Sequence, residues 1–128
     1  LLYAVQNKMP YGNVKNKAGK FIEPTLKSVT AAANVAIPDD TNKSLTNTDA
    51  AAGYPISSFT WLIFYKEQKY GGKTKERAEA LAKLLMWTVG SGQKYAEQLQ
   101  YAPLSKEAAE KSAKLIRSMT YNGSPLLK

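Results

Sequence analysis

Neither cysteine nor histidine occurs in the 128 residues of this chain. Their absence excludes disulfides, thiol nucleophiles, imidazole bases and the usual zinc and iron ligand sets. The only adjacent acidic pair, Asp39-Asp40, follows Pro38 without an apparent third ligand, which favours an Asp-rich turn over a metal or acid–base site. We therefore expect no catalytic residue, no metal site, no cofactor and no enzymatic activity.

Long apolar runs are also missing. A helix that spans a membrane needs about 18 consecutive apolar residues, and the apolar block Trp61–Tyr65 is far shorter. A hydrophobic content of 44% with 22% charged residues argues against a disordered chain. The length suits one ordinary domain.

Arginine is scarce, because only Arg77 and Arg117 stand among the 18 basic residues that give the net charge of +8. Nucleic-acid readers rely on arginine for bidentate contacts. A lysine excess is more typical of solvated helix faces with a general attraction for anions. The positive net charge leaves a basic polyanion-binding domain as an alternative function. Because arginine is scarce, we expect no nucleic-acid partner.

Helix signals dominate most of the chain. Thr25, Thr74 and Ser105 are candidate N-caps, and two turns are indicated by Asn-Lys-Ala-Gly at 16–19 and by Asn-Gly at 122–123. We expect Trp87 to pack under the break at Gly90–Gly92. The pattern predicts a hairpin around 14–22 and helices over 1–8, 25–34, 74–88, 93–100 and 105–119.

The segment Ser57–Lys66 is the one clear strand that the pattern predicts. Apolar side chains alternate on both of its faces, with Phe59, Trp61, Ile63 and Tyr65 on one and Leu62 and Phe64 on the other. A strand with two apolar faces is typical of the interior of a sheet, so Trp61 is expected in the core. Because one strand cannot form a sheet, its neighbours are expected outside this chain.

Several landmarks in order resemble the C-terminal part of the PstS-type phosphate-binding proteins, the substrate-capturing components of phosphate ABC transporters. These landmarks are YAVQNKMPYG at 3–12, FIEPTLKSVTAAA at 21–33, GYPISSFTWLIFYK at 53–66, LMW at 85–87, GQKYA at 92–96, LQYAPL at 99–104 and YNG at 121–123. The resemblance covers essentially the whole chain.

The resemblance implies part of an α/β, two-lobed periplasmic-binding-protein fold (type II, Venus flytrap), with phosphate held between the lobes. Residues 1–53 would belong to the second lobe. Residues 54–128 would be the crossover and the C-terminal part of the first lobe, where a buried strand and three helices pack. Tyr54, Ser57 and Ser58 would lie at the hinge and line the cleft.

No phosphate-binding residue carries over from the family. Its phosphate contacts come mainly from earlier loops and helix N-termini, whose hydroxyl and N–H groups hold the oxyanion. This chain has no Ser-Gly-x-Gly-Thr-like turn, and neither Arg77 nor Arg117 matches the family arginine. We therefore expect the main ligands upstream of this chain.

The expected partners follow from the resemblance. They are inorganic phosphate, bound through the complete protein, an ABC transporter permease, and a missing N-terminal portion or a complementary chain. The expected location is the periplasm or cell surface of a bacterium. The first residues, LLYAVQNKMPYG, read as the end of a helix in something larger, so a structural or assembly module that pairs with a complementary chain is a further alternative.

Overall fold

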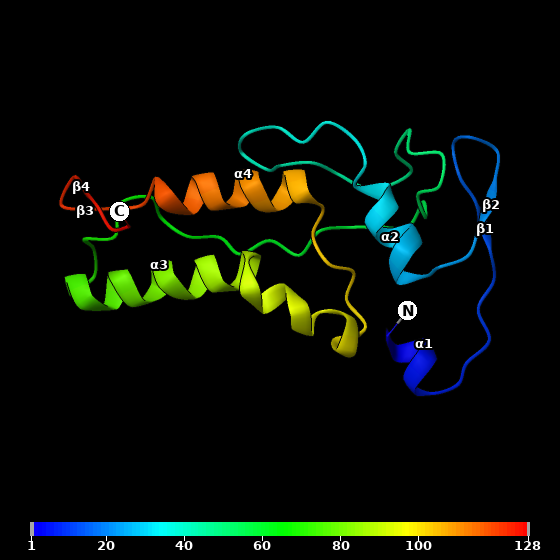
Figure 1. The fold of residues 1–128 in the computed structure, drawn as a ribbon, viewed down its shortest axis with the longest axis horizontal. Helices are drawn as coiled ribbons and strands as arrows, with labels where there is room; N and C mark the ends of the chain where they lie inside the picture. Colours follow the sequence, from blue (N-terminus) through cyan, green and yellow to red (C-terminus); the bar gives the residue numbers. More distant parts are fainter. Residues whose placement is uncertain (1, 128) are drawn as a thin grey trace.

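A computed structural model describes residues 2–127 and shows helices joined by long loops and two short hairpins (Figure 1). The elements in chain order are α1 (Leu2–Gln6), β1 (Val14–Lys15), β2 (Phe21–Ile22), α2 (Leu26–Ala32), α3 (Lys75–Val89), the 3-10 helices η1 (Ser91–Tyr95) and η2 (Glu97–Leu99), α4 (Lys106–Arg117), β3 (Thr120–Tyr121) and β4 (Ser124–Pro125). Within residues 2–127, none of the helices combines the length and apolar character that a membrane span requires.

Helices α3 and α4 pack side by side and carry the main core (Figure 1). Each begins at a side-chain cap, because the hydroxyls of Thr74 and Ser105 accept hydrogen bonds from the backbone N–H groups of Arg77 and Ala108. Small alanines on α3 let the two helices approach closely. The buried residues of this core are Ala78, Ala82, Leu85, Ile116, Met119 and Leu126.

The chain closes in a two-stranded antiparallel hairpin, in which Tyr121 pairs with Ser124. Its turn residues Asn122 and Gly123 both have positive φ, at 53° and 76°, as a tight hairpin turn of the Asn-Gly type requires. A parallel bridge joins Thr120 to Glu67. The segment before α3 therefore enters the same small sheet as the C-terminus.

The first part of the chain forms a second, smaller packing unit. The β1–β2 hairpin pairs Val14 with Ile22, and its buried Asn16 donates from Nδ2 to the carbonyl of Ala51 at 3.1 Å. Helix α2 begins at a capping box, in which Thr25 and Ser28 satisfy each other's backbone N–H groups. The buried apolar residues of this unit include Ala32, Ala33, Ile37 and Leu45.

Most locally specified elements are confirmed. Helices α2, α3 and α4, both hairpin turns and the three N-caps form where the sequence predicts them. The predicted packing of Trp87 under the glycine break is also confirmed, because a Cβ at Gly92 would lie 3.0 Å from the Trp87 ring. The predicted helix over 93–100 is instead split into η1 and η2, with Gln100 left-handed at its end.

The buried strand predicted over Phe59–Tyr65 does not form within residues 2–127, and its burial between strands outside this chain stays a prediction. The segment is extended, but it belongs to no strand, and Ile63 is 97% exposed. Trp61 was expected in the core and is 47% exposed. The physical reason is that residues 2–127 supply no strand alongside this segment, and an unpaired strand has no sheet in which to bury two apolar faces.

Candidate functional site

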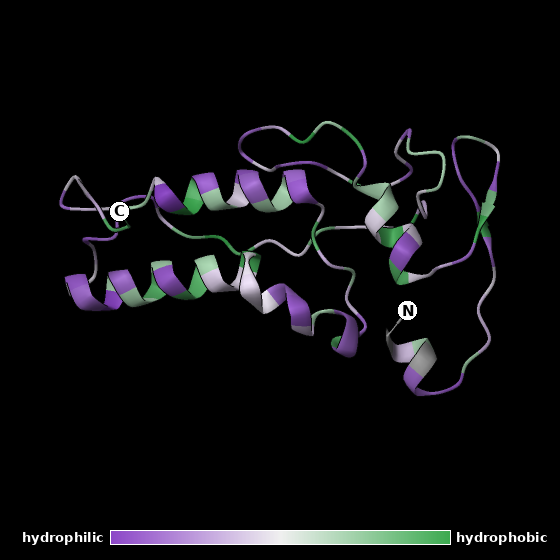
Figure 2. Ribbon diagram, in the orientation of Figure 1, coloured by the Kyte–Doolittle hydropathy of each residue, from purple (hydrophilic) through white to green (hydrophobic). Residues whose placement is uncertain are grey.

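A large cavity of about 1410 Å³ opens between the extended segment 56–64, the facing sides of α3 and α4, the loop after η2, and α2 with the loop that follows it. We call it the groove. Its apolar lining includes Phe59, Leu62, Leu85, Leu99 and Leu104. Figure 2 shows hydrophobic colour along the extended segment and on the neighbouring turns of α3. The groove is thus mainly an apolar surface.

The three residues that the sequence places at a hinge all line the groove. The backbone N–H of Tyr54 donates to the carbonyl of Ser28 at 3.0 Å, and the Ser57 hydroxyl donates to the carbonyl of Tyr54 at 2.7 Å. Ser57 is buried, whereas Ser58 is exposed and donates to the carbonyl of Phe59 at 3.0 Å. The hydroxyl groups of Ser57 and Ser58 therefore donate to nearby carbonyls. The hinge role of Tyr54, Ser57 and Ser58 stays a prediction.

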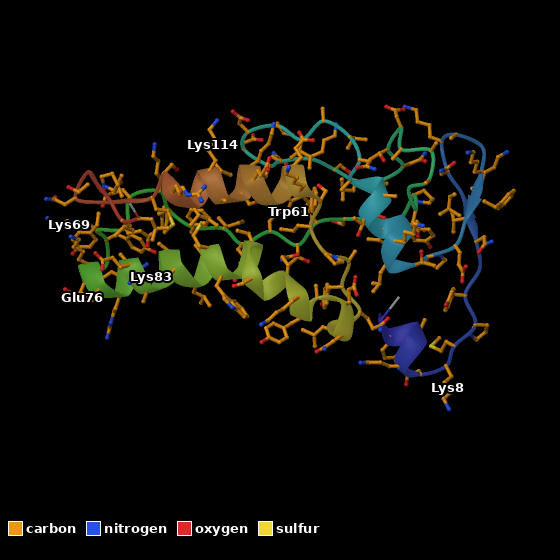
Figure 3. All side chains as sticks on the ribbon, viewed as in Figure 1. Lys8, Trp61, Lys69, Glu76, Lys83 and Lys114 are labelled. Atoms are coloured by element: carbon orange, nitrogen blue, oxygen red, sulfur yellow. The ribbon has the colours of Figure 1, made fainter. Side chains whose placement is uncertain are left out.

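The groove offers few groups for an oxyanion. Among its lining residues, Lys66 is the only cation and Asp40 the only anion. Phosphate sites in proteins combine several N–H and hydroxyl donors, commonly at a helix N-terminus. The first turn of α3, which contains Glu76 and lies near Lys69, is at the end of that helix away from the groove (Figure 3). The groove suits apolar polypeptide better than a phosphate ion.

A second, shallower hollow of about 510 Å³ lies beside the start of α3 and contains three lysines. Lys69 Nζ donates to Asn122 Oδ1 at 3.1 Å, and Lys73 Nζ donates to Gln68 Oε1 at 2.7 Å. Lys75 pairs with Glu79 at 3.7 Å. Each ammonium group already contacts another side chain of this chain, so the three lysines stabilise local structure.

Glu67, which follows the extended segment closely, holds the C-terminal hairpin in place. Its carboxylate accepts hydrogen bonds from the backbone N–H groups of Gly123 at 3.0 Å, Asn122 at 2.9 Å and Lys69 at 2.8 Å, and from the Thr120 hydroxyl at 2.9 Å. These bonds, led by that from Gly123, lower the pKa of Glu67 to about 2 because they favour the charged form. We call this set of contacts the Glu67 clamp.

Sequence reasoning missed the Glu67 clamp. Glu67 and Gly123 stand 56 positions apart, and neither helical nor strand periodicity relates them. The only local signal is the Asn122-Gly123 turn, whose consecutive backbone N–H groups can bind an anion. That signal identifies the turn but not the carboxylate that it binds.

Asp39 joins the loop after α2 to the outer side of α4. Its carboxylate pairs with Lys114 at 3.2 Å and with Lys111 at 3.3 Å, and Lys114 projects from α4 in Figure 3. The hydrogen bond from Lys114, followed by that from Lys111, lowers the pKa of Asp39. Asp40 accepts from the backbone N–H of Asn42 at 3.0 Å, so the predicted Asp-rich turn is confirmed.

Metal-ligating side chains do not gather elsewhere. Within residues 2–127, no group of three or more acidic side chains is arranged to hold a metal ion. The distinctive surface of the chain is therefore the groove and the extended segment beside it. The backbone of residues 56–65 makes no hydrogen bond to any other backbone group of residues 2–127.

Comparison with known proteins places this geometry in a family context. No family model matches the chain. It is 35% identical over 107 residues to a phosphate-binding protein PstS of Xylella fastidiosa (strain 9a5c), covering 81% of this chain and 28% of that relative. It is 31% identical over 103 residues to the PstS of Methanocaldococcus jannaschii, covering 73% and 26%.

A PstS of Pasteurella multocida is 28% identical over 112 residues, covering 85% of this chain and 31% of the relative. The chain thus spans less than a third of the length of these relatives. The resemblance predicted from the sequence is confirmed: the chain is similar to one portion of the PstS phosphate-binding proteins, consistent with their C-terminal part. This similarity implies a periplasmic-binding-protein fold.

Proposed function

We propose that this chain is the C-terminal segment of a high-affinity inorganic phosphate-binding protein that delivers phosphate to an ABC transporter permease. The observation that carries the proposal is the similarity of 73–85% of the chain to proteins named for phosphate binding. A role in binding, without catalysis, also agrees with a sequence that has neither cysteine nor histidine. The complete protein would act in the periplasm or at the cell surface.

In this proposal, residues 1–53 contribute to the second lobe of a Venus-flytrap protein and residues 54–128 to the first. Two sets of contacts support a crossing near Tyr54. The chain just before the extended segment bonds to the smaller unit around α2, through Tyr54 to Ser28 and through Asn47 to Pro55. The chain just after it bonds to Thr120, in the unit built on α3 and α4.

The phosphate ligands would lie in the part of the protein that this chain does not contain. The support is that the groove has few groups able to bind an oxyanion: its lining residues include one lysine and no arginine. The Tyr54–Ser58 stretch would border the cleft and position the lobes. Phosphate recognition would depend on donor groups elsewhere in the complete polypeptide.

The test is isothermal titration of phosphate into two proteins. One is the 128-residue chain, and the other is the complete polypeptide encoded by the reading frame that contains it. We expect no micromolar binding by the chain and tight binding by the complete polypeptide, with sulfate as the control anion. A complete polypeptide that ignores phosphate would refute the proposed function, and micromolar binding by the chain alone would refute the placement of the ligands.

An assembly module that pairs with a separate complementary chain is the second candidate. The observation that favours it is the missing backbone pairing of residues 56–65. Co-purification distinguishes the two candidates, because a separate partner would be recovered as a second polypeptide. A single polypeptide that includes the 128 residues and binds phosphate would exclude the second candidate.

A further inference from the structure

The β1–β2 hairpin carries lysines around an exposed aromatic side chain, and we call its residues, 14–22, the basic hairpin. The first 22 residues of the sequence contain no acidic residue, since the first one is Glu23. They contain four lysines: Lys8, Lys15, Lys17 and Lys20. Phe21, between the last of these lysines and Ile22, is 69% exposed. The hairpin therefore combines positive charge with an exposed apolar ring.

The two faces of the basic hairpin differ in burial. Val14 pairs with Ile22, and both residues are half-buried. Lys15 pairs with Phe21, and both residues are exposed. Residues directly opposite each other in an antiparallel pair have their side chains on the same face. The inner face is thus partly covered by the protein, and the outer face presents an ammonium group beside a phenyl ring.

Asn16 fixes the hairpin to the rest of the smaller unit. It is 6% exposed, and its Nδ2 donates to the carbonyls of Ala51 at 3.1 Å and Gly53 at 3.3 Å. Its Oδ1 accepts from the N–H of Lys20 at 3.1 Å, and its own N–H donates to the Lys20 carbonyl at 2.8 Å. The turn is ordered before any partner arrives, which reduces the conformational entropy that binding would cost.

The positive charge of this part of the chain is largely uncompensated. Lys17 pairs with Asp49 at 2.6 Å, and both side chains are exposed, so the pair is weak. The other three lysines pair with no acidic side chain of residues 2–127: Lys8, Lys15 and Lys20. Lys8 projects from the same end of the molecule as the hairpin (Figure 1, Figure 3). This end therefore attracts anions.

The lysines also favour an outer face that stays at the surface of a longer polypeptide. Lysine is almost never fully buried without a partner, and burial of an unpaired ammonium group is strongly unfavourable. A segment that covered Phe21 would have to bury or pair Lys15, which lies directly opposite. The part of the relatives outside the matched region is therefore a poor occupant for this face.

We propose that the basic hairpin docks the protein on an anionic phospholipid surface, with the Phe21 ring inserted between headgroups and the lysines against their phosphates. The composition favours lipid over an acidic protein. Protein interfaces are depleted in lysine and enriched in arginine, and the first 22 residues contain no arginine. Lysine is a flexible point charge that suits mobile headgroups, whereas arginine suits fixed bidentate partners. Lysines beside an aromatic ring are typical of segments that bind membrane surfaces.

Docking of this kind is reversible and goes beyond phosphate binding, on which it does not depend. Each lysine near an anionic membrane raises the affinity by roughly five-fold. Salt screens the attraction over a distance of about 10 Å. In the context of the proposed function, docking would hold the protein on the membrane that contains the permease, without any span of its own.

The first test is sedimentation of the complete polypeptide with two kinds of vesicle. One kind contains equal parts of phosphatidylcholine and phosphatidylglycerol, and the other contains phosphatidylcholine alone. We expect binding to the first kind to be at least about 30-fold tighter and to be lost at high salt. A complete polypeptide that does not bind the anionic vesicles would overturn the proposal. That result would also follow if the hairpin were covered or bound an acidic protein instead.

The second test changes the charge of the hairpin. Lys15→Glu combined with Lys20→Glu is expected to weaken binding to the anionic vesicles by at least about 30-fold. The matched control combines Lys83→Glu on α3 with Arg117→Glu on α4, since both residues are exposed and the net charge changes equally. Equal losses in the two double variants would overturn the proposal, because net charge and not the hairpin would then cause the binding.

The third test removes the aromatic ring. Phe21→Ser should weaken vesicle binding by about 10-fold, because the apolar ring no longer leaves water. The control is Leu84→Ser, which changes a 57% exposed leucine on α3 and should bind the vesicles as the wild type does. Equal binding by Phe21→Ser and the wild type would overturn the insertion of the ring.

Phosphate titration of the same polypeptides separates this inference from the proposed function. Lys15→Glu combined with Lys20→Glu should bind phosphate as the complete wild-type polypeptide does. Vesicle binding by a complete polypeptide that ignores phosphate would support the docking surface and refute the proposed function. Phosphate binding by a complete polypeptide that ignores the anionic vesicles would do the reverse.

Discussion

The carboxylate of Glu67 accepts a 3.0 Å hydrogen bond from the backbone N–H of Gly123, and this contact joins the chain just after the extended segment to the C-terminal hairpin. Three further donors, the N–H groups of Asn122 and Lys69 and the hydroxyl of Thr120, complete the clamp. A single side chain thus sets the position of a turn 55 to 56 residues later in the chain. Its effect is measurable because it depends on charge.

The stability of the chain should depend on the protonation of Glu67. Folding lowers the pKa of this carboxyl from 4.5 to about 2. The clamp therefore contributes its full stabilisation above about pH 4.5 and loses it as the pH falls towards 2. We expect Glu67→Gln to lower the urea midpoint at pH 7 and to flatten its decline over this range.

The control for the clamp is Glu97→Gln, which changes an exposed glutamate in η2. This variant should keep the wild-type dependence on pH between 4.5 and 2. Hydrogen exchange at the Asn122 and Gly123 amides gives a local readout, and exchange should quicken only in Glu67→Gln. Parallel pH profiles for the wild type and Glu67→Gln would contradict the clamp.

Gly53 is packed against α2 and leaves no space for a side chain. A Cβ at this position would lie 2.8 Å from the Cα of Ala32 and 3.1 Å from the carbonyl oxygen of Ala50. Because both neighbours are backbone atoms, neither can move without shifting its segment. We expect Gly53→Ala to lower the free energy of unfolding by about 1–3 kcal/mol.

Gly12→Ala is the matched control for Gly53→Ala, because a Cβ at Gly12 meets no atom within 4 Å. Its free energy of unfolding should stay within about 0.5 kcal/mol of the wild type. Urea unfolding at pH 7 measures both variants. Equal stabilities for Gly53→Ala and Gly12→Ala would show that α2 does not pack on Gly53 as described.

Met119 fills the centre of the α3–α4 core and is fully buried. Its truncation removes apolar contacts and leaves a cavity, so we expect Met119→Ala to lower the free energy of unfolding by about 2–5 kcal/mol. Met9 is 49% exposed and serves as the control for the same substitution. A smaller loss for Met119→Ala than for Met9→Ala, measured by urea unfolding, would contradict this core.

Gln93 connects the end of α3 to the loop before α4. Its Nε2 donates to the carbonyl of Thr88 at 2.7 Å, and its Oε1 accepts from the N–H of Leu104 at 2.8 Å. All three residues are half-buried. Gln93→Ala should lower the free energy of unfolding by about 1–3 kcal/mol, since it leaves two backbone groups without partners.

Gln98→Ala is the control for Gln93→Ala, because Gln98 lies in η2 and is exposed to solvent. Thermal unfolding of Gln98→Ala should match the wild type closely. The near-ultraviolet circular dichroism, to which Trp87 beside the same helix break contributes, should change only in Gln93→Ala. Identical melting curves for both variants would remove the bridging role of Gln93.

The sequence alone predicted the features that depend on residues close together in the chain. Thr74 and Ser105 start their helices because a hydroxyl can cap an N–H group three positions later. Asn122-Gly123 makes its turn because these residues accept positive φ. The order of short landmarks also sufficed to indicate the phosphate-binding family, and the comparisons confirm that similarity.

Contacts between distant residues required the tertiary structure. Local periodicity gave Phe59–Tyr65 the pattern of a buried strand, but burial on both faces requires neighbouring strands, and residues 2–127 provide no strand beside it. The Glu67 clamp likewise depends on a turn 56 residues away. Spacing along the chain reports which faces are apolar, whereas the structure alone shows which surfaces meet, because burial is a property of the folded neighbourhood and not of the residue.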